Sequence, residues 1–269
     1  MTNNMQNEID DPTDPRLDVF LGLRDHHARQ QREQPGGDMA GNFIAEGVSV
    51  IERGLAHGYE LTSVLCDARR ADRLSPVVRD TNVLTAKGEV LTAVTGRPEL
   101  RDPLACFVRP TLADPVSLLR VGTRFAVLEG INNPNNLGVI MRNAAALGVD
   151  AVLLDPTCAD PLYRRAIRSS MGQVFAIPHA RIGELPDAIG LFREHDVTTI
   201  ALTPSADVDL RDLETPGNKI AVLLGAEGPG LTSATMQAAD LRVRIEMSHD
   251  IDSLNVANAA AIAFWVVQS

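Results

Sequence analysis

Five short and almost uninterrupted apolar runs mark the second half of this 269-residue chain. The runs are F-A-V-L-E, A-V-L-L-D, Q-V-F-A-I-P, V-T-T-I-A-L and K-I-A-V-L-L, and helical segments separate the first four. A strand that is apolar at every position is buried on both faces, as in a parallel sheet that helices cover on both sides. We therefore predict an α/β fold for this half, with a ligand site beyond the carboxyl ends of its strands.

The first half predicts a second, smaller α/β unit. The pattern predicts a strand in N-F-I-A-E-G, which ends at Gly47. It predicts a helix in the following V-S-V-I-E-R-G-L-A-H-G and another strand in L-T-S-V-L-C-D. R-P-T-L-A-D-P-V-S-L-L-R-V-G, with its two prolines, is typical of a linker. The predicted organisation is an extension at 1–40 that is partly disordered or forms one helix, a small domain at 41–110, a linker at 111–122 and a main domain at 123–269.

The net charge argues against a protein that binds nucleic acid through bulk charge, but the distribution of charge along the chain matters more than its sum. The formal net charge is −10, with −4 in residues 1–40, 0 in residues 41–120 and −6 in residues 121–269. Arginine supplies nearly all of the positive charge, and arginine forms the better bidentate contacts with phosphate. Composition alone favours the alternative of a solvated surface with mixed charges.

Composition also excludes several other classes of protein. No apolar run reaches the ~18 residues of a membrane span, and the polar N-terminus lacks a signal-peptide core, so we expect a cytoplasmic protein without a membrane partner. Cys66, Cys106 and Cys158 are isolated, and we predict free, buried thiols. The six histidines lack ligand spacing, and we expect no metal.

Two turns that follow predicted strands carry residues that a plain core does not require. In G-I-N-N-P-N-N-L-G-V-I-M-R, Asn135 or Asn136 is a candidate N-cap, while Arg142 lies in the following helix among apolar residues. G-A-E-G-P-G-L places Glu227 in a glycine-rich loop, for which a simple tight turn is the alternative. This loop is neither the G-x-G-x-x-G of a dinucleotide site nor a phosphate-binding P-loop.

The C-terminal segment has a polar entrance to an apolar helix. The helix is predicted at Val256–Val267, and Ser253, Asn255 and Asn258 crowd its start. Ser253 is the expected N-cap, because its hydroxyl could satisfy backbone N–H groups of the first turn.

Three stretches of the sequence, taken together, resemble in order and spacing the three motifs of the SpoU/TrmH family. They are N-N-L-G-V-I-M-R-N-A-A-A-L-G, L-L-G-A-E-G-P-G-L and I-E-M-S-H-D-I-D-S-L-N-V-A-N-A-A-A-I. These proteins are S-adenosylmethionine-dependent RNA ribose 2′-O-methyltransferases. The resemblance covers roughly Arg124 to the end of the chain. The segment F-I-A-E-G-V-S-V-I-E-R-G-L is similar to the small substrate-binding domain that often precedes the catalytic domain.

The resemblance implies a mostly parallel sheet with helices on both faces, tied in a deep trefoil knot, and S-adenosylmethionine as the cofactor. True knots are rare, and nothing in the residue pattern itself predicts one. Six residues match or flank the positions that hold the methyl donor: Gly225, Ile245, Leu254, Leu202, Gly230 and Met247. H-D-I-D before Ser253 departs from the family pattern, in which small or apolar residues are more usual.

The resemblance also assigns the catalytic positions, which are Asn136, Arg142, Glu227, Ser253 and Asn255. The family mechanism uses Arg142 as a base, but a guanidinium holds its proton strongly. We therefore expect Arg142 to bind the phosphate beside the target ribose and to stabilise the developing alkoxide, with Glu227 and Asn136 holding it in place. A buried Arg142–Glu227 ion pair that only supports the fold is the alternative.

Contacts with RNA are expected from arginines outside the three motifs. The candidates are Arg168, Arg53, Arg69 and Arg70, together with Arg73, and a solvated surface charge is the alternative for each. His26, His27, Arg29 and Arg32 would form a basic helical face, although the net charge of residues 1–40 argues against that.

The sequence therefore predicts a cytoplasmic, S-adenosylmethionine-dependent methyltransferase that acts on a ribose 2′-hydroxyl of ribosomal or transfer RNA. The resemblance implies a homodimer, for which Ala261, Phe264, Trp265 and Val266 offer apolar surface. The alternatives are a non-catalytic RNA-binding homologue that retains the fold, and a methyltransferase that modifies a base.

Overall fold

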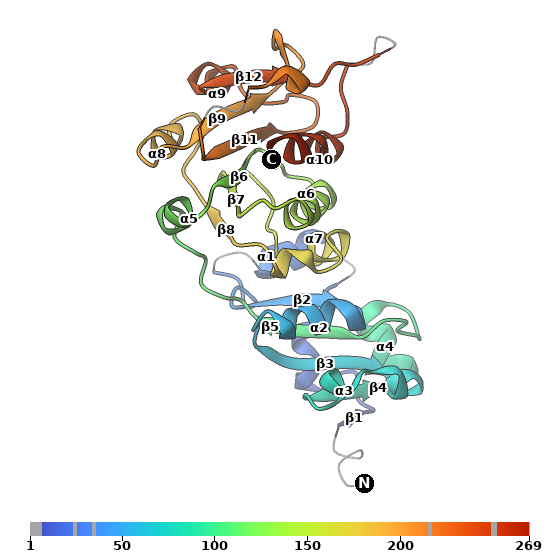
Figure 1. The fold of residues 1–269 in the computed structure, drawn as a ribbon. Helices are drawn as coiled ribbons and strands as arrows, with labels where there is room; N and C mark the ends of the chain where they lie inside the picture. Colours follow the sequence, from blue (N-terminus) through green and yellow to red (C-terminus); the bar gives the residue numbers. More distant parts are fainter. Residues whose placement is uncertain (1–6, 24–25, 34–35, 215–216, 249–251, 269) are drawn as a thin grey trace. The chain divides into compact units, whose positions relative to one another are not determined.

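The computed structural model describes residues 7–23, 26–33, 36–214, 217–248 and 252–268. The chain forms two compact units, which are described separately (Figure 1). The first contains residues 1–110 and 162–168, and the second contains residues 111–161 and 169–269. None of the helices in these described ranges is long and apolar enough to cross a membrane.

A mixed five-stranded sheet forms the centre of the first unit, in the order β1-β4-β3-β5-β2. Its strands are β1 (Glu8–Ile9), β4 (Val83–Ala86), β3 (Leu61–Asp67), β5 (Leu104–Val108) and β2 (Asn42–Glu46). β4 lies parallel to β1 and β3, whereas β5 is antiparallel to β3 and β2. The predicted strands N-F-I-A-E and L-T-S-V-L-C-D are confirmed as β2 and β3.

Short helices complete the first unit. They are η1 (Pro15–Phe20), α1 (His26–Glu33), α2 (Val48–Ala56), η2 (Ala68–Arg73), α3 (Pro76–Arg79) and α4 (Gly88–Thr95), and α7 (Arg164–Ser169) contributes its residues up to Arg168. The helix predicted after Gly47 is confirmed as α2.

The described part of residues 7–40 belongs to the core of this unit. Ile9, Leu17 and Phe20 are fully buried in one cluster with Leu65 of β3 and Leu84 of β4. The segment that the sequence suggested as an extension is therefore integral to the hydrophobic core.

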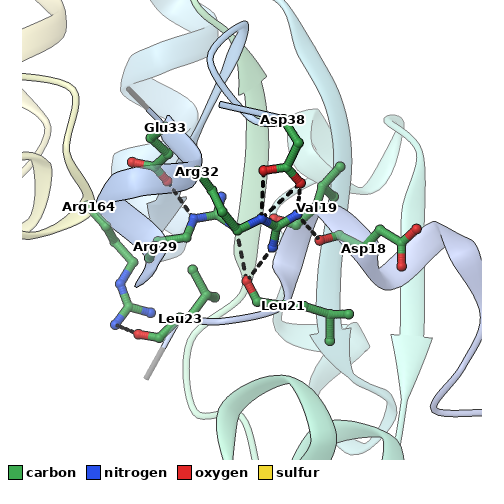
Figure 2. A network of polar contacts seen from close by, with 9 residues as sticks. All are labelled: Asp18, Val19, Leu21, Leu23, Arg29, Arg32, Glu33, Asp38 and Arg164. Atoms are coloured by element: carbon green, nitrogen blue, oxygen red, sulfur yellow. Dashed lines mark hydrogen bonds and ion pairs between the residues drawn. The ribbon is translucent and has the colours of Figure 1, made fainter. Parts of the chain in front are cut away.

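Arg29 of α1 lies at the centre of a polar network (Figure 2). Its side chain is buried, and its Nε donates to Glu33 Oε1 at 2.6 Å. Its Nη1 donates to the carbonyl oxygens of Val19 and Leu21 at 2.9 and 3.0 Å. A charged group removed from water requires such partners, so Arg29 ties α1 to the preceding loop.

Arg32 has a similar structural role. It pairs with Asp38 at 2.7 Å and also donates to the carbonyl oxygen of Leu21 at 3.0 Å (Figure 2). The hypothesis of a basic helical face is therefore wrong for Arg29 and Arg32. The side chains of His26 and His27 lie outside the described part of the structure.

The second unit contains a seven-stranded sheet in the order β10-β12-β9-β11-β6-β7-β8, and every described pair of strands is parallel. Its strands are β6 (Arg124–Glu129), β7 (Ala151–Leu154), β8 (His179–Arg181), β9 (Thr198–Leu202), β10 (Val208–Asp209), β11 (Ile220–Gly225) and β12 (Leu241–Arg244). Four of the five apolar runs form β6, β7, β9 and β11, which confirms the predicted parallel sheet.

The remaining run, Q-V-F-A-I-P, was wrongly predicted to be a strand. In Q-V-F-A-I-P, residues Gln173–Phe175 form the 3₁₀ helix η3, with Val174 and Phe175 buried. The ladder starts only at the carbonyl of Pro178, which accepts from the Val152 amide at 3.0 Å, and the strand is β8. Proline has no N–H to donate, so it is suited to the start of a strand and unsuited to its interior.

Helices cover both faces of this sheet. They are α5 (Pro115–Val121), α6 (Pro134–Ala146), α8 (Ile189–Arg193), α9 (Ser233–Ala238) and α10 (Val256–Val267), with the short η4 (Leu210–Asp212). α5, α8 and α9 contribute to one core cluster with the sheet, while α6 and α10 pack against each other and against β7 and β11. The helix predicted at Val256–Val267 is confirmed.

Two expectations need correction here. The predicted linker at 111–122 contains α5, because Asp114 caps its N-terminus by accepting from the Ser117 amide and Pro115 occupies the first helical position. Phe264 of α10 is fully buried and offers no surface to a partner, whereas Trp265 is 68% exposed.

Asp67 ends β3 as a buried carboxylate. Arg69 pairs with it at 2.6 Å, and this guanidinium lowers the pKa of Asp67 from 3.8 to about 2. Arg69 also lies 3.5 Å from Glu99. The predicted RNA-binding residue Arg69 is thus engaged in stabilising the first unit.

We predict that this pair makes stability depend on acid pH. Because the folded-state pKa of Asp67 lies below its unfolded value, its contribution of about 1–2 kcal/mol is present above pH 4 and is lost as the pH falls towards 2. Asp67→Asn should lower the free energy of unfolding at pH 7, and its deficit relative to the unsubstituted chain should shrink below pH 4. Urea unfolding at several pH values measures this. Asp72→Asn, at an exposed position, is the control, and a pH-independent deficit for Asp67→Asn would contradict the prediction.

Candidate functional site

The carboxyl ends of β9, β11 and β12 meet the start of α10 around a cavity of about 590 Å³. This position is where ligands bind in open parallel sheets, and the volume is within the usual range for small-molecule sites. All six residues that the sequence assigned to the methyl donor line this cavity: Leu202, Gly225, Gly230, Ile245, Met247 and Leu254.

The loop after β11 forms one wall of the cavity from backbone. A Cβ atom added to Gly225 would lie 2.1 Å from the carbonyl carbon of Gly230, so only glycine fits. Gly230 donates its N–H to the Ala226 carbonyl at 2.9 Å and has a φ of +71°, a left-handed conformation that favours glycine. The glycines therefore let the chain fold back on itself beside the cavity.

Asn255 connects three segments that are distant in the sequence. Its Nδ2 donates to Asn136 Oδ1 of α6 at 3.1 Å and to Glu227 Oε1 of the glycine loop at 2.5 Å. Its Oδ1 accepts from the Ala257 amide at 3.0 Å and so caps α10. Three of the predicted catalytic residues are therefore in direct contact beside the cavity, which Glu227, Ser253 and Asn255 line.

Both predicted helix caps lie at a different residue. Asn255, and not Ser253, caps α10, while Ser253 is an exposed residue of the cavity wall. Asn133, and not Asn135 or Asn136, caps α6 by accepting from the Asn135 amide at 2.9 Å. The N-cap of α6 is Asn133 because Pro134 takes the first helical position, where its nitrogen has no hydrogen to donate and needs no partner.

Arg142 is exposed on α6 and makes no hydrogen bond or ion pair within the described part of the chain. The expectation that Asn136 and Glu227 hold it is not met, because Asn255 connects those two side chains instead. The alternative of a buried Arg142–Glu227 ion pair is also wrong, since both residues are exposed. As far as the described residues go, the Arg142 guanidinium has all of its donors available for a ligand.

The other predicted RNA-binding arginines occupy varied settings. Arg168 is exposed at the end of α7, Arg53 is half-buried in α2, and Arg70 is half-buried in η2. None of the three lines the 590 Å³ cavity.

Sequence reasoning missed Thr203 and Ser205, which also line the cavity. Their hydroxyl groups lie 3.0 Å apart, directly after β9. The signal was present, because T-P-S follows the apolar run V-T-T-I-A-L at the edge where the site was expected.

Glu129, a further missed residue, fixes the far end of the glycine loop. This buried residue ends β6 and accepts from the Thr232 amide at 2.8 Å and from Thr235 Oγ1 at 2.6 Å. Its carboxylate therefore anchors the chain just beyond the glycine loop.

The described residues contain no group of three or more His, Cys, Asp or Glu that could hold a metal ion. Cys66, Cys106 and Cys158 are free and buried, as predicted. Burial raises the pKa of the Cys66 thiol to about 11 and that of Cys158 to about 12, so both are neutral thiols at physiological pH. The segment His249–Ile251, part of the unusual H-D-I-D, lies outside the described residues.

Comparison with known proteins gives concordant matches. The model of the SpoU rRNA Methylase family matches residues 123–265. An uncharacterized tRNA/rRNA methyltransferase of Mycobacterium tuberculosis is 40% identical over 266 residues, which span 96% of this chain and 90% of the relative. A 23S rRNA (uridine(2479)-2′-O)-methyltransferase of Streptomyces viridochromogenes is 28% identical, over 84% of this chain and 82% of the relative.

Solved structures agree over nearly the whole chain. The crystal structure of an AdoMet-bound rRNA methyltransferase from Sinorhizobium meliloti has a TM-score of 0.79 and 25% sequence identity, and the match covers 97% of each chain. The similarity thus includes both units.

We predict that Asn255→Asp preserves the cap of α10 but places a carboxylate against Glu227. Asp caps helices as well as Asn does, so the expected loss of about 0.5–1 kcal/mol in the free energy of unfolding comes from like-charge repulsion with Glu227 and from the lost donation to Asn136. Glu227→Gln in the same chain should restore the part of the loss that repulsion causes, as measured by urea unfolding at pH 7.

Asn258→Asp is the matched control for that prediction. It adds the same charge one turn further along α10, where an acid near the helix start is favourable. If Glu227→Gln leaves the Asn255→Asp deficit unchanged, the Asn255–Glu227 contact does not form in solution.

Proposed function

The chain belongs to the SpoU rRNA methylase family, and we propose that it transfers a methyl group from S-adenosylmethionine to a ribose 2′-hydroxyl of ribosomal or transfer RNA. The 2′-O specificity is supported by the Streptomyces viridochromogenes relative, which carries that activity in its name. The proposal places the protein with its RNA substrate in the cytoplasm.

One observation carries this proposal. Asn136, Glu227 and Asn255 come from the three separate motifs, and Asn255 donates to both of the others at the edge of a 590 Å³ cavity. A plain structural core would not require three polar side chains to meet at the carboxyl edge of a sheet. Their arrangement leaves amide and carboxylate groups beside the cavity in which the methyl donor would bind.

The residues of the cavity fit S-adenosylmethionine. Leu202, Ile245 and Leu254 offer apolar contacts for an adenine ring, and Gly225 lets the glycine loop fold back against its own backbone to form a wall of the cavity. The hydroxyl groups of Thr203 and Ser205 add hydrogen-bonding capacity. Bound there, S-adenosylmethionine would supply an electrophilic methyl group.

Arg142 supplies the charge that the reaction needs. A ribose hydroxyl is a very weak acid, and its oxygen becomes more negative as it attacks the methyl group. The proton would pass to the adjacent phosphate or to water, and the methyl–sulfur bond would break to release S-adenosylhomocysteine. A guanidinium cannot accept that proton, but it can bind the adjacent phosphate and stabilise the developing negative charge. The exposed position of Arg142 and its lack of a partner within the described chain suit this role. Ser253 and Asn255 would position the sugar.

The C-terminal segment is proposed to pass through the loop that precedes it and so form the deep trefoil knot that the family resemblance implies. Support comes from the cavity itself, which is lined by the glycine loop, by Ile245 and Met247, and by residues 253–256. We also propose that the protein forms a homodimer through α10. Ile262 and Trp265 present exposed apolar side chains there, 39% and 68% exposed, and Ala261 and Val266 are half-buried beside them.

We predict that Arg142→Gln lowers methyl transfer by about 100-fold or more, because it removes the cation but keeps a polar side chain. The affinity for S-adenosylmethionine should stay within about twofold, since Arg142 does not line the cavity. Arg142→Lys should fall between, because lysine keeps the charge without the planar fork. Transfer from labelled S-adenosylmethionine to RNA and calorimetry with the donor measure the two effects.

Three results would count against this account. Undiminished transfer by Arg142→Gln would remove Arg142 from the site. A methyl group found on a base after nuclease digestion and mass analysis would exclude the ribose as acceptor. Failure to bind the donor would favour a non-catalytic RNA-binding protein.

We predict that Trp265→Asp converts the dimer to a monomer, because it places a charge in an apolar interface. Analytical ultracentrifugation of the full chain measures the mass. Val121→Asp changes an equally apolar and exposed side chain outside α10, and it should leave the dimer intact. A wild-type monomer, or a Trp265→Asp dimer, would refute the proposed interface.

A further inference from the structure

A second cavity, of about 360 Å³, lies in the first unit and has a cationic lining. Arg70 and Arg73 line it from η2, and Arg101 lines it from the segment before β5. Within the described ranges, none of these three guanidinium groups makes a hydrogen bond or an ion pair. Three arginines therefore converge on one cavity with their donors unused.

The acidic groups of this cavity neutralise little of that charge. Asp67 is buried, pairs with Arg69 at 2.6 Å and accepts from the Leu100 amide at 3.5 Å, so its charge is already balanced. Cys66 is a neutral thiol, because burial raises its pKa to about 11. Asp102 is the other carboxylate of the lining, and it is exposed. The lining keeps an excess of positive charge.

Helix α2 begins at the same cavity. Its first residue, Val48, is part of the lining, and the N-cap is Gly47, which has a φ of +105° and no side chain to cap the helix. The N–H groups of Val50 and Ile51 donate to the Gly47 carbonyl at 3.1 and 3.0 Å. The N–H groups of Val48 and Ser49, together with the positive end of the helix dipole, therefore add to the field of the arginines.

We propose that this arginine cavity, formed by Arg70, Arg73 and Arg101 at the start of α2, binds a phosphate group of a nucleotide. The guanidinium fork matches pairs of phosphate oxygens, and backbone N–H groups at a helix start complete such sites. A volume of about 360 Å³ accommodates a phosphate with its sugar.

This inference rests on the proposed function for the source of the phosphate. If the substrate is RNA, an internal phosphodiester occupies the arginine cavity, and the first unit holds the RNA at a nucleotide other than the one that reacts. A free mononucleotide has the same phosphate chemistry and is the other source. The two sources are distinguishable by the probes below.

The test compares the full chain with the variant Arg70→Gln/Arg73→Gln/Arg101→Gln. Each is titrated with a single-stranded RNA oligonucleotide, with adenosine 5′-monophosphate and with inorganic phosphate. The triple variant should bind the oligonucleotide at least about 30-fold more weakly, and the slope of log affinity against log salt should fall by about 0.7, as expected when one phosphate of a single strand is no longer neutralised. Asp102→Asn should strengthen binding, because it removes a carboxylate from the lining.

Arg97→Gln is the matched control. Arg97 is an exposed arginine of the same unit outside the arginine cavity, so its loss should change oligonucleotide binding by less than about threefold. The substituted arginines have no partners in the described chain, so the variants should show unchanged thermal unfolding by circular dichroism.

Each outcome has a distinct meaning. Weakened binding of the oligonucleotide alone supports the arginine cavity as an RNA phosphate site, and weakened binding of adenosine monophosphate supports it as a mononucleotide site. Equal binding of every probe by the wild type and the triple variant overturns the inference. Because these assays need neither donor nor methyl transfer, an inactive wild type that still binds phosphate here would refute only the proposed function.

Discussion

The arrangement of the site depends on the side-chain amide of Asn255. One nitrogen donates to Asn136 and Glu227, and the oxygen of the same amide caps α10. The start of the helix, the glycine loop and α6 are therefore fixed relative to one another by a single group. An amide can do this because it offers donors and an acceptor at once, which neither a hydroxyl nor a carboxylate of similar reach provides in the same geometry.

The backbone supplies the complementary part of the site. At Gly225 the chain approaches Gly230 so closely that no side chain fits, and Glu129 anchors the segment just beyond. Main-chain groups held this tightly need no rearrangement when a ligand arrives, so little free energy is spent on ordering the pocket. Arg142 is exposed on α6 and is not part of the cavity lining, so the proposed function assigns donor binding and stabilisation of the acceptor to different parts of the domain.

The sequence predicted this site better than it predicted the contacts within it. The apolar runs located β6, β7, β9 and β11, because burial on both faces leaves a signal in every residue. β12 was missed because L-R-V-R alternates, and β8 was missed because it has only three residues. The sequence wrongly predicted that Asn136 and Glu227 hold Arg142, since a motif gives spacing along the chain and not the direction of a side chain. The N-cap of α10 was predicted at Ser253, two residues before Asn255. Ser and Asn are equally good capping residues, so the sequence alone does not distinguish them.

The proposed RNA contacts come from arginine and not from lysine, and this choice determines which conditions can change their strength. The two lysines of the chain are structural: Lys87 pairs with Glu8 at 2.7 Å, and Lys219 donates to the Leu119 carbonyl at 2.7 Å. Guanidinium groups stay protonated at every physiological pH and are not substrates for lysine acetylation. The charge of the proposed phosphate-binding arginines therefore does not change with pH in the physiological range. Ionic strength is the variable that would raise or lower their affinity for a phosphate backbone.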